Sequence, residues 1–329
     1  MVDQNIIEKL KSSGLTGRSG SGFLTGLKWE AVKNEIADKK YIICNASEGE
    51  PNIFKDAFIL ERYPEKVVDG IKIALETIDN SEAIIYLGKN NYKNFSKKLE
   101  SLITGLPIKL FEKTGGYIAG EESAACELIE GKKPEPRTKP PFISQIGLYG
   151  KPTLVNNVET FYFVAKISEG DYKKTKFYSI SGDVKNKGVF ELPEDATIEK
   201  ILKETKNWPD FEFFVKSGGG ACGQILLQNE LNQPVCGSAG IIIFDKKKTD
   251  VIKLMKEWAE FFHKGNCDKC VPCREGIYRI LKMMESERID KKILDDLFFA
   301  MEESSFCSLG RSIPETFRGA INKLLKFTP

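Results

Sequence analysis

Four cysteines near the C-terminal end constrain the fold of this chain more than any other feature. Cys267, Cys270 and Cys273 follow a C-x-x-C-x-x-C spacing, and Cys307 is a distant fourth. Three closely spaced thiolates with one remote partner are typical of a cubane iron–sulfur cluster. A structural zinc site also takes four thiolates, but usually from two separated C-x-x-C pairs. The spacing therefore favours the cluster and leaves zinc as the alternative.

The sequence around these cysteines has the periodicity of helices. From Asp250 onward, apolar residues recur at steps of three and four positions. This pattern predicts a helical bundle with the cysteines in the loops between packed helices. The expected helices cover 251–265, 273–286, 293–304 and 315–327.

Upstream of the cysteines, short β-rich runs alternate with helical stretches. Strands are expected at 41–47, 83–88 and 107–114, with a helix around Glu65–Thr77. Such alternation predicts an α/β domain with a mainly parallel sheet, whose ligands bind where the strands end. The segment at about 175–245 then shows two strands, one helix and further strands, which predicts a small β-grasp-like module.

The composition excludes several classes of partner. The 329 residues are 41% hydrophobic, and 49 basic residues balance 47 acidic ones, so a net charge of +2 gives no broad field for nucleic acid. Since no apolar run could span a membrane and no signal core is present, we expect a cytoplasmic protein without direct membrane insertion. The single histidine, His263, excludes catalysis by a histidine pair. The remaining cysteines are expected as free thiols: Cys44, Cys126, Cys222 and Cys236.

A glycine-rich loop from Gly14 to Gly26 precedes a helix expected near Leu27. Its backbone amides can approach a phosphate or a flat ring because glycine has no side chain, and the helix N-terminus adds favourable polarity. The loop fits neither the G-x-G-x-x-G pattern after a strand nor a Walker A loop. A purely structural turn is the alternative.

Two acidic turns are further candidates for ligand binding. Asn45, Glu48 and Glu50 follow a buried strand and can accept hydrogen bonds from ribityl or ribose hydroxyls, the alternative being a solvated acidic turn. Glu121 and Glu122 stand at the start of a helix, where they could simply complement the helix dipole.

The segment 133–160 is dense in proline and glycine, which predicts a pre-ordered loop across another surface. Within it, Phe142 could stack on an aromatic base. Asn156 and Asn157 can donate to and accept from the edge of a heterocycle, or they could cap a helix.

Distinctive motifs follow one another along the whole chain. From the N-terminus they are GRSGSGFLTGLKW, CNASEGEP, FKD, YIAGEES, PRTKPPF, GLYGKPTLVNNVET, SGDV, GVFE, GSAGIIIFD, CDKCVPCREG and FCSLG. With these motifs the chain resembles, over nearly its whole length, the flavin-binding, NADH-oxidising subunit of respiratory complex I. The related diaphorase subunits of NAD-linked hydrogenases and formate dehydrogenases share the resemblance.

The resemblance implies three domains and their cofactors. Residues 1–167 would form the α/β domain that binds FMN and NADH, 168–247 a β-grasp (SLBB-type) domain, and 248–329 a helical [4Fe–4S] domain. Cys267, Cys270, Cys273 and Cys307 match the cluster ligands. The positions that match FMN contacts are Gly17, Arg18, Lys28, Asn45, Glu48, Gly120, Glu121, Asn156, Asn157 and Thr160. Those that match the dinucleotide site are Phe23, Glu50, Glu122, Lys139 and Phe142.

The chain departs from the family's motifs at a few positions. Ser19 adds bulk where backbone would lie against the cofactor, Ser47 replaces an aspartate of the flavin turn, and Asn52 replaces a glycine. We therefore expect weaker flavin binding or an altered flavin potential. The N-terminal segment is also shorter than expected of a complex I subunit, so the family's usual partner contacts do not follow from the resemblance there.

The implied reaction is hydride transfer from NADH to FMN, followed by release of single electrons to the cluster. No protein acid or base is required, and the charge of Glu50 should favour NADH over NADPH. The implied partners are a thioredoxin-like [2Fe–2S] subunit and a larger iron–sulfur or catalytic subunit, which could hold the chain at the cytoplasmic face of a membrane. Quinone, protons, carbon dioxide and ferredoxin are all open as final acceptors.

Two other functions are compatible with the sequence. The chain could be an electron relay or scaffold that keeps the cluster but has lost its flavin site through Ser19 and Ser47. It could also be a zinc-stabilised binding module. The absorbance of bound flavin would distinguish the NADH-oxidising subunit from the first alternative. Analysis for zinc, iron and sulfide would distinguish it from the second.

Overall fold

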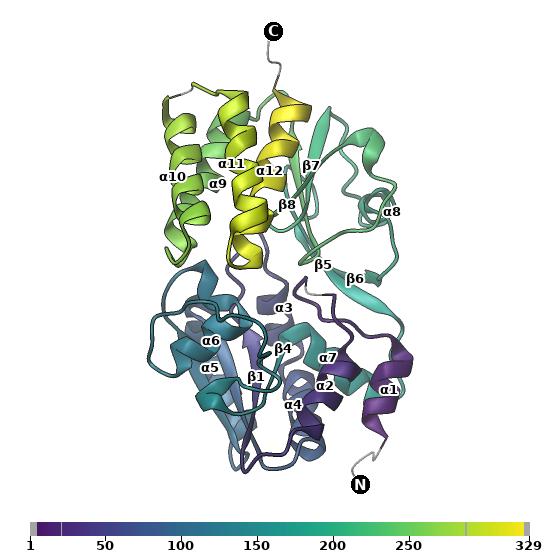
Figure 1. Cartoon of the computed structure of the whole chain (residues 1–329). Coiled ribbons are helices and arrows are strands. Elements are labelled where there is room, and N and C mark those ends of the chain that lie inside the picture. Colours follow the sequence, from purple (N-terminus) through teal and green to yellow (C-terminus); the bar gives the residue numbers. More distant parts are fainter. Residues whose placement is uncertain (1–4, 21, 287, 326–329) are drawn as a thin grey trace.

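The computed structural model describes residues 5–20, 22–286 and 288–325, and Figure 1 shows the chain as a lower and an upper half. In the described part, the lower half holds a four-stranded sheet in the order β3-β2-β1-β4, with all neighbouring strands parallel. The strands are β1 (Lys40–Ala46), β2 (Ser81–Gly88), β3 (Ile108–Lys113) and β4 (Thr153–Asn157). The sheet confirms the predicted α/β domain. Strand β4 was not among the expected strands, because it lies inside the segment rich in proline and glycine.

Helices cover both faces of this sheet because successive β1 side chains are buried on opposite sides. Ile42 and Cys44 pack with α4 and α7, whereas Tyr41 and Ile43 pack with α6. The helices of this half are α1 (Ile6–Ser13), α2 (Thr25–Asn34), α3 (Lys55–Arg62), α4 (Pro64–Thr77), α5 (Lys89–Ile103), α6 (Glu122–Ile129) and α7 (Val158–Ser168). Short 3-10 turns, η1 (Tyr117–Gly120) and η2 (Leu148–Gly150), connect them.

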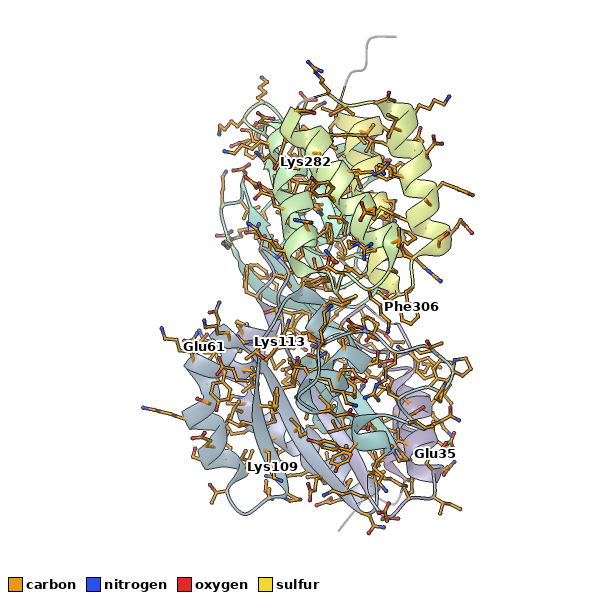
Figure 2. The ribbon with its side chains drawn as sticks, turned by 60° about the vertical axis from the view of Figure 1, so that its left-hand side comes forward. Glu35, Glu61, Lys109, Lys113, Lys282 and Phe306 are labelled. Atoms are coloured by element: carbon orange, nitrogen blue, oxygen red, sulfur yellow. The ribbon has the colours of Figure 1, made fainter. Side chains whose placement is uncertain are left out.

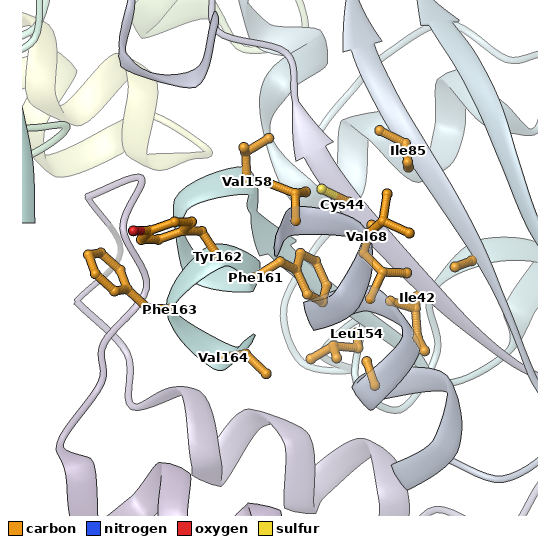
Figure 3. Close-up of a cluster of buried hydrophobic side chains, with 14 of the residues drawn as sticks. Ile42, Cys44, Val68, Ile85, Leu154, Val158, Phe161, Tyr162, Phe163 and Val164 are labelled. Atoms are coloured by element: carbon orange, nitrogen blue, oxygen red, sulfur yellow. The ribbon is translucent and has the colours of Figure 1, made fainter. Parts of the chain in front are cut away.

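The tightest packing in this half is between α4 and α7. Figure 3 shows Phe161 of α7 among the side chains of Val68, Ile42 and Leu154. Gly70 of α4 lies so close to the backbone of Phe161 that an added methyl group would overlap its carbonyl oxygen. Glycine at 70 therefore sets the distance between the two helices, and with it the position of α7 behind the sheet.

The upper half contains a mixed five-stranded sheet in the order β6-β5-β9-β7-β8. Strands β5 and β9 are parallel, and the other neighbours are antiparallel. The elements are β5 (Thr175–Gly182), β6 (Gly188–Pro193), α8 (Ile198–Glu204), β7 (Phe213–Gly218), β8 (Gly223–Leu227), the 3-10 turn η3 (Gln228–Glu230) and β9 (Gly240–Asp245). This order of two strands, one helix and further strands is the predicted one.

Four helices complete the upper half beside this sheet, as Figure 1 shows. They are α9 (Val251–Gly265), α10 (Val271–Ser286), α11 (Lys291–Ser304) and α12 (Ser308–Leu324). The predicted helical region is confirmed, but the starts of three helices were wrong: α10, α11 and α12 begin two, two and seven residues earlier than expected. Helix α10 begins before Cys273, because Pro272 is tolerated in a first helical turn. Helix α12 begins at Ser308 and continues through Pro314. The last expected helix extends to 327, and its final residues lie outside the described ranges.

No helix in the described ranges is long and apolar enough to cross a membrane.

The upper sheet and the bundle share a buried charge. Lys216 of β7 is completely buried, donates to the carbonyl oxygen of Ala221 at 2.6 Å and lies 3.5 Å from the centre of the Trp258 ring of α9. Burial lowers the pKa of Lys216 from 10.5 to about 7, although the nearby Cys222 and Glu50 raise it. Lys216 thus connects the sheet to α9, and the stability of this contact depends on whether the lysine is protonated.

Replacement of Gly70 by alanine should destabilise the fold by about 3 kcal/mol, because the new methyl group forces α4 and α7 apart. Chemical denaturation measures this free energy of unfolding. Gly188→Ala is the matched control, since its methyl group would meet the Phe190 ring at an ordinary 3.5 Å. Equal stability of the two variants would show that the α4–α7 distance is not fixed by Gly70.

Stability should rise with pH through the titration of Lys216. Between pH 7 and 10.5 the unfolded chain binds more protons at this lysine than the folded chain, so the free energy of unfolding increases with pH across that window. Lys216→Met should remove about 3 kcal/mol of this increase between pH 6.5 and 9.5. Denaturation at several pH values tests it, with the exposed Lys203→Met as control. Parallel pH profiles of wild type and Lys216→Met would contradict it.

Candidate functional site

Predicted site residues from three segments meet at the carboxyl ends of the parallel strands. Asn45 of β1 pairs in register with Asn157 of β4. The side-chain amide of Asn157 donates to the carbonyl oxygen of Asn45 at 3.1 Å, and that of Asn45 donates to the carbonyl oxygen of Gly120 at 2.9 Å. Parallel sheets bind ligands at the carboxyl ends of their strands, so these three residues lie where a ligand is expected. The carboxyl ends of β1 to β4 are termed the ligand edge below.

A buried lysine, Lys55, fixes the side chains at the ends of these strands. Lys55 is 2% exposed, forms ion pairs with Asp56 at 2.7 Å and Glu159 at 3.1 Å, and donates to the side-chain oxygen of Asn157 at 3.1 Å. Burial alone would lower its pKa, but the two carboxylates raise the pKa of Lys55 above its ordinary value. Neither Lys55 nor Glu159 was predicted as a site residue. Lys55 belongs to the FKD motif, which was the sequence signal that could have identified it.

Glu48 caps the first turn of α3. Its carboxylate accepts from the backbone N–H groups of Asp56 at 3.1 Å and Ala57 at 3.4 Å. Burial, together with the negative charge of Asp56, raises the pKa of Glu48 to about 8. The side chain therefore fixes the turn after β1 against the start of α3.

Asn156 and Thr160 are held by the N-terminal segment. The indole N–H of Trp29 donates to the side-chain oxygen of Asn156 at 2.9 Å, and the backbone N–H of Arg18 donates to the Thr160 hydroxyl at 3.2 Å. Both residues are buried. They fix α2 and the glycine-rich loop against β4 and α7.

The glycine-rich loop is stabilised through its backbone and through Arg18. The Gly17 N–H donates to the carbonyl oxygen of Phe23 at 2.9 Å, and Gly20 and Gly22 have positive φ angles that favour glycine. The Arg18 guanidinium is buried and pairs with Glu194 at 2.7 Å, so it points to the upper half. The loop can therefore offer a ligand its backbone amides. Ser21 of this motif lies outside the described residues.

Four of the predicted residues form one ion cluster beside this loop. Glu122 pairs with Lys28 at 3.1 Å and with Lys139 at 2.9 Å, and Lys139 also pairs with Glu121 at 3.0 Å. Burial opposes ionisation of Glu122, but the two lysines lower its pKa. Phe23 and Phe142, predicted to contact the dinucleotide, are 52% and 54% exposed. Exposed rings can stack on a ligand that arrives from solvent.

Glu50 is positioned differently from the other predicted dinucleotide contacts. Its carboxylate accepts from the Tyr117 hydroxyl at 2.6 Å and from the backbone N–H of Ala221 at 2.9 Å. Burial and the charge of Glu50 raise the pKa of Tyr117, which keeps the phenol a donor. Glu50 thus connects the turn after β1 with the loop between β7 and β8.

The four cysteines lie at the lower end of the bundle. Cys267 and Cys270 are in the loop before α10, whereas Cys273 is in the first turn of α10 and Cys307 directly precedes α12, so the prediction that all four lie in loops was wrong for Cys273. Burial raises the pKa of Cys273, and the neighbouring Cys270, Cys307 and Cys267 thiols raise it further. The other three thiols thus lie close enough to Cys273 to affect its pKa, and four thiols are the soft donor set that an iron–sulfur cluster takes. Among the described residues, no three His, Cys, Asp or Glu side chains are grouped as a single metal ion would need.

The turn 115–121 connects the ligand edge to these cysteines. A methyl group added at Gly116 would lie 3.2 Å from the Cα of Gly265, at the end of α9, and the Tyr117 and Phe261 rings are 5.0 Å apart. Glu121, at the other end of the turn, is close enough to Cys307 to raise its pKa, though burial contributes more. Figure 2 shows Phe306, next to Cys307, at the same junction between the halves. The ligand edge and the cysteines are therefore separated by a single turn.

Comparisons with known proteins agree with this arrangement. A family model described as the Nuo51 FMN-binding domain matches residues 10–166, and one described as the NADH-ubiquinone oxidoreductase-F iron–sulfur binding region matches 253–326. Chemically, the glycine backbone at the ligand edge and the four thiols fit FMN and an iron–sulfur cluster.

Several relatives match over nearly the whole chain. The F 2 subunit of the NADH-quinone oxidoreductase of Rhizobium meliloti (strain 1021) is 32% identical over 96% of this chain and 86% of its own length. The HoxS alpha subunit of the NAD-reducing hydrogenase of Cupriavidus necator is also 32% identical, over 97% of this chain. A crystal structure of an NAD⁺-reducing [NiFe]-hydrogenase in the H₂-reduced state superposes with a TM-score of 0.90 at 29% identity over 97% of this chain. The chain spans 59% of the HoxS subunit and 61% of the crystallised hydrogenase chain. By its identity to the Rhizobium protein over most of both chains, this protein belongs to the family of NADH-quinone oxidoreductase F subunits.

Proposed function

We propose that this chain is the NADH-oxidising (diaphorase) subunit of a larger oxidoreductase. It accepts hydride from NADH at FMN and passes single electrons through a [4Fe–4S] cluster to partner iron–sulfur subunits. One observation carries the proposal: the turn 115–121 touches both the ligand edge, through Gly120, and the helix that leads to the cysteines, through Gly116. Electron transfer requires that the two cofactors lie close together, and this turn keeps their sites adjacent.

When bound, FMN supplies the conversion from two-electron to one-electron chemistry. The chain's own residues orient and enclose it. Asn45, Asn157 and Gly120 hold one another by hydrogen bonds at the ends of the strands, and Lys55 fixes the side-chain oxygen of Asn157. The loop 14–26 presents backbone amides beside β4. The remaining FMN positions that the resemblance implies stay predictions.

The dinucleotide is proposed to bind over the exposed face of this edge. Phe23 and Phe142 offer aromatic surface, and the ion cluster of Lys28, Glu122 and Lys139 lies beside them. Glu50 adds a fixed negative charge at the junction with the upper half. Such a charge opposes a 2′-phosphate, which is the basis for a preference for NADH.

The same proposal includes the domains of the chain and its partner subunits. The mixed sheet of the upper half would be the β-grasp (SLBB-type) domain, within the limits 168–247. The relatives are subunits by name, so we propose a thioredoxin-like [2Fe–2S] subunit and a larger iron–sulfur subunit as partners. Through them the chain would reach the cytoplasmic face of a membrane or a catalytic subunit.

Cofactor content tests the proposed function directly. The full chain, purified without oxygen, should carry FMN and iron with sulfide, and NADH should reduce both the flavin and the cluster. Cys270→Ser should abolish the cluster's paramagnetic resonance signal while retaining FMN and NADH-dependent reduction of an artificial acceptor. Cys236→Ser, outside the ligand set, is the control and should behave as wild type. Zinc without iron and sulfide, or a flavin that NADH does not reduce, would refute the function.

The choice between NADH and NADPH should depend on the charge of Glu50. Glu50→Gln keeps the shape of the side chain but removes its charge, so the ratio of kcat/KM for NADH to that for NADPH should fall about tenfold. Tyr117→Phe, which removes a hydrogen bond but leaves the carboxylate, should change both cofactors alike and preserve the ratio. A ratio that is the same in wild type and Glu50→Gln would rule out this role of Glu50.

A further inference from the structure

Lys113 is a cation at the ligand edge that neither the motifs nor the proposed mechanism uses. It is the last residue of β3, and Figure 2 shows it at the end of the lower sheet nearest the junction of the two halves. Lys109, on the same strand, lies at the opposite end of the sheet, and its side chain is 79% exposed. The two lysines therefore differ in surroundings although they share a strand.

The Lys113 ammonium reaches the two turns that hold predicted flavin contacts. A methyl group added at Gly49 or at Gly120 would lie 3.8 Å from its nitrogen. Gly49 belongs to the turn after β1, which carries Asn45 and Glu48, and Gly120 ends the turn 115–121. Neither glycine has a side chain to cover the ammonium, so its nitrogen lies over bare backbone.

Among the residues that the structure describes, Lys113 has no hydrogen-bond acceptor and no carboxylate partner. The polar side chains of these two turns are engaged elsewhere. Ser47 donates to Asn45, and Glu50 is held by Tyr117 and Ala221. Glu48 accepts from the start of α3, and Glu121 from the start of α6.

The charge of Lys113 is therefore unmatched within the described part of the chain. Burial lowers the pKa of Lys113 to about 8, because the ammonium is partly removed from water and no anion compensates for the lost hydration. An anionic group of a ligand at this edge would supply the missing partner.

The position of Lys113 across the sheet indicates which part of FMN it meets. The glycine-rich loop and α2 lie beside β4, where Trp29 bonds Asn156, whereas Lys113 is on β3 at the other edge. Three strand spacings separate these edges, about 14 Å. A phosphate bound by the amides of the loop would leave the flavin ring toward β1, β2 and Lys113.

We propose that Lys113 faces the pyrimidine edge of the bound flavin and stabilises the negative charge that the ring gains on reduction. This inference rests on the proposed function and adds a positioning charge to it. Hydride from NADH brings two electrons and one proton, leaves NAD⁺, and adds one negative charge to the ring. A fixed cation near that edge raises the flavin potential because it binds the reduced ring better than the oxidised one.

The test compares Lys113→Met with Lys113→Arg and with the exposed control Lys109→Met in the full chain. The readouts are the dissociation constants of FMN and riboflavin from the oxidised protein, and the midpoint potential of bound FMN. Lys113→Met should weaken binding of reduced FMN at least tenfold more than that of oxidised FMN. That fold-change lowers the two-electron potential by about 30 mV or more. Lys113→Arg should remain close to wild type, and Lys109→Met should not change.

The possible outcomes separate this inference from the function on which it rests. Equal loss of affinity for oxidised and reduced FMN, with riboflavin unaffected, would assign the ammonium to the phosphate and overturn the proposal. An unchanged potential in Lys113→Met, in a protein that binds FMN and unfolds at the wild-type temperature, would overturn it as well. A wild-type chain that binds no FMN would refute the proposed function itself, and this inference with it.

Discussion

The contact between Gly116 and Gly265 is the constraint on which the working of this protein depends. At this point the turn 115–121 lies against the end of α9, two residues before Cys267, and a side chain at either glycine would push the turn and the helix apart. Electron transfer weakens steeply with separation, whereas hydride transfer and cluster binding need no such contact. Two binding sites would exist without it, but electrons would not pass efficiently from one to the other.

Buried lysines stabilise each half internally, and one carboxylate joins the two halves. Lys55 fixes the strand ends in the lower half, and Lys216 joins the upper sheet to the bundle. Glu50 crosses between them, since its carboxylate is bound by Tyr117 from one half and by the backbone of Ala221 from the other. Buried charges are costly unless they are matched, so their geometry is specific. The junction is therefore defined by hydrogen-bonded polar groups, in addition to the packing of Tyr117 against Phe261.

The sequence predicted the chemistry of this protein better than its boundaries. The spacing of Cys267, Cys270 and Cys273 is a local feature that reports its ligand set directly, and alternating strands and helices indicated the parallel sheet. Strand β4 and the start of α12 were missed, because proline and glycine near both usually mark loops and only tertiary packing stabilises these elements there.

Side-chain direction could not be predicted from the sequence in the same way. Arg18 belongs to a glycine-rich motif, yet its guanidinium pairs with Glu194, which is far away in the sequence. Lys113 belongs to no motif. Only the tertiary structure shows that its ammonium lies beside the backbone of Gly49 and Gly120, which have no side chains to pair with it. Motifs locate the backbone that approaches a ligand, whereas the electrostatics of the site depend on charges from unrelated segments. Ser47 is neutral and Glu48 has a raised pKa, so neither of these neighbouring side chains supplies Lys113 with an anionic partner. With the proposed role of Lys113, the potential of the flavin would depend on a charge brought in by tertiary structure as well as on the residues of the flavin motifs.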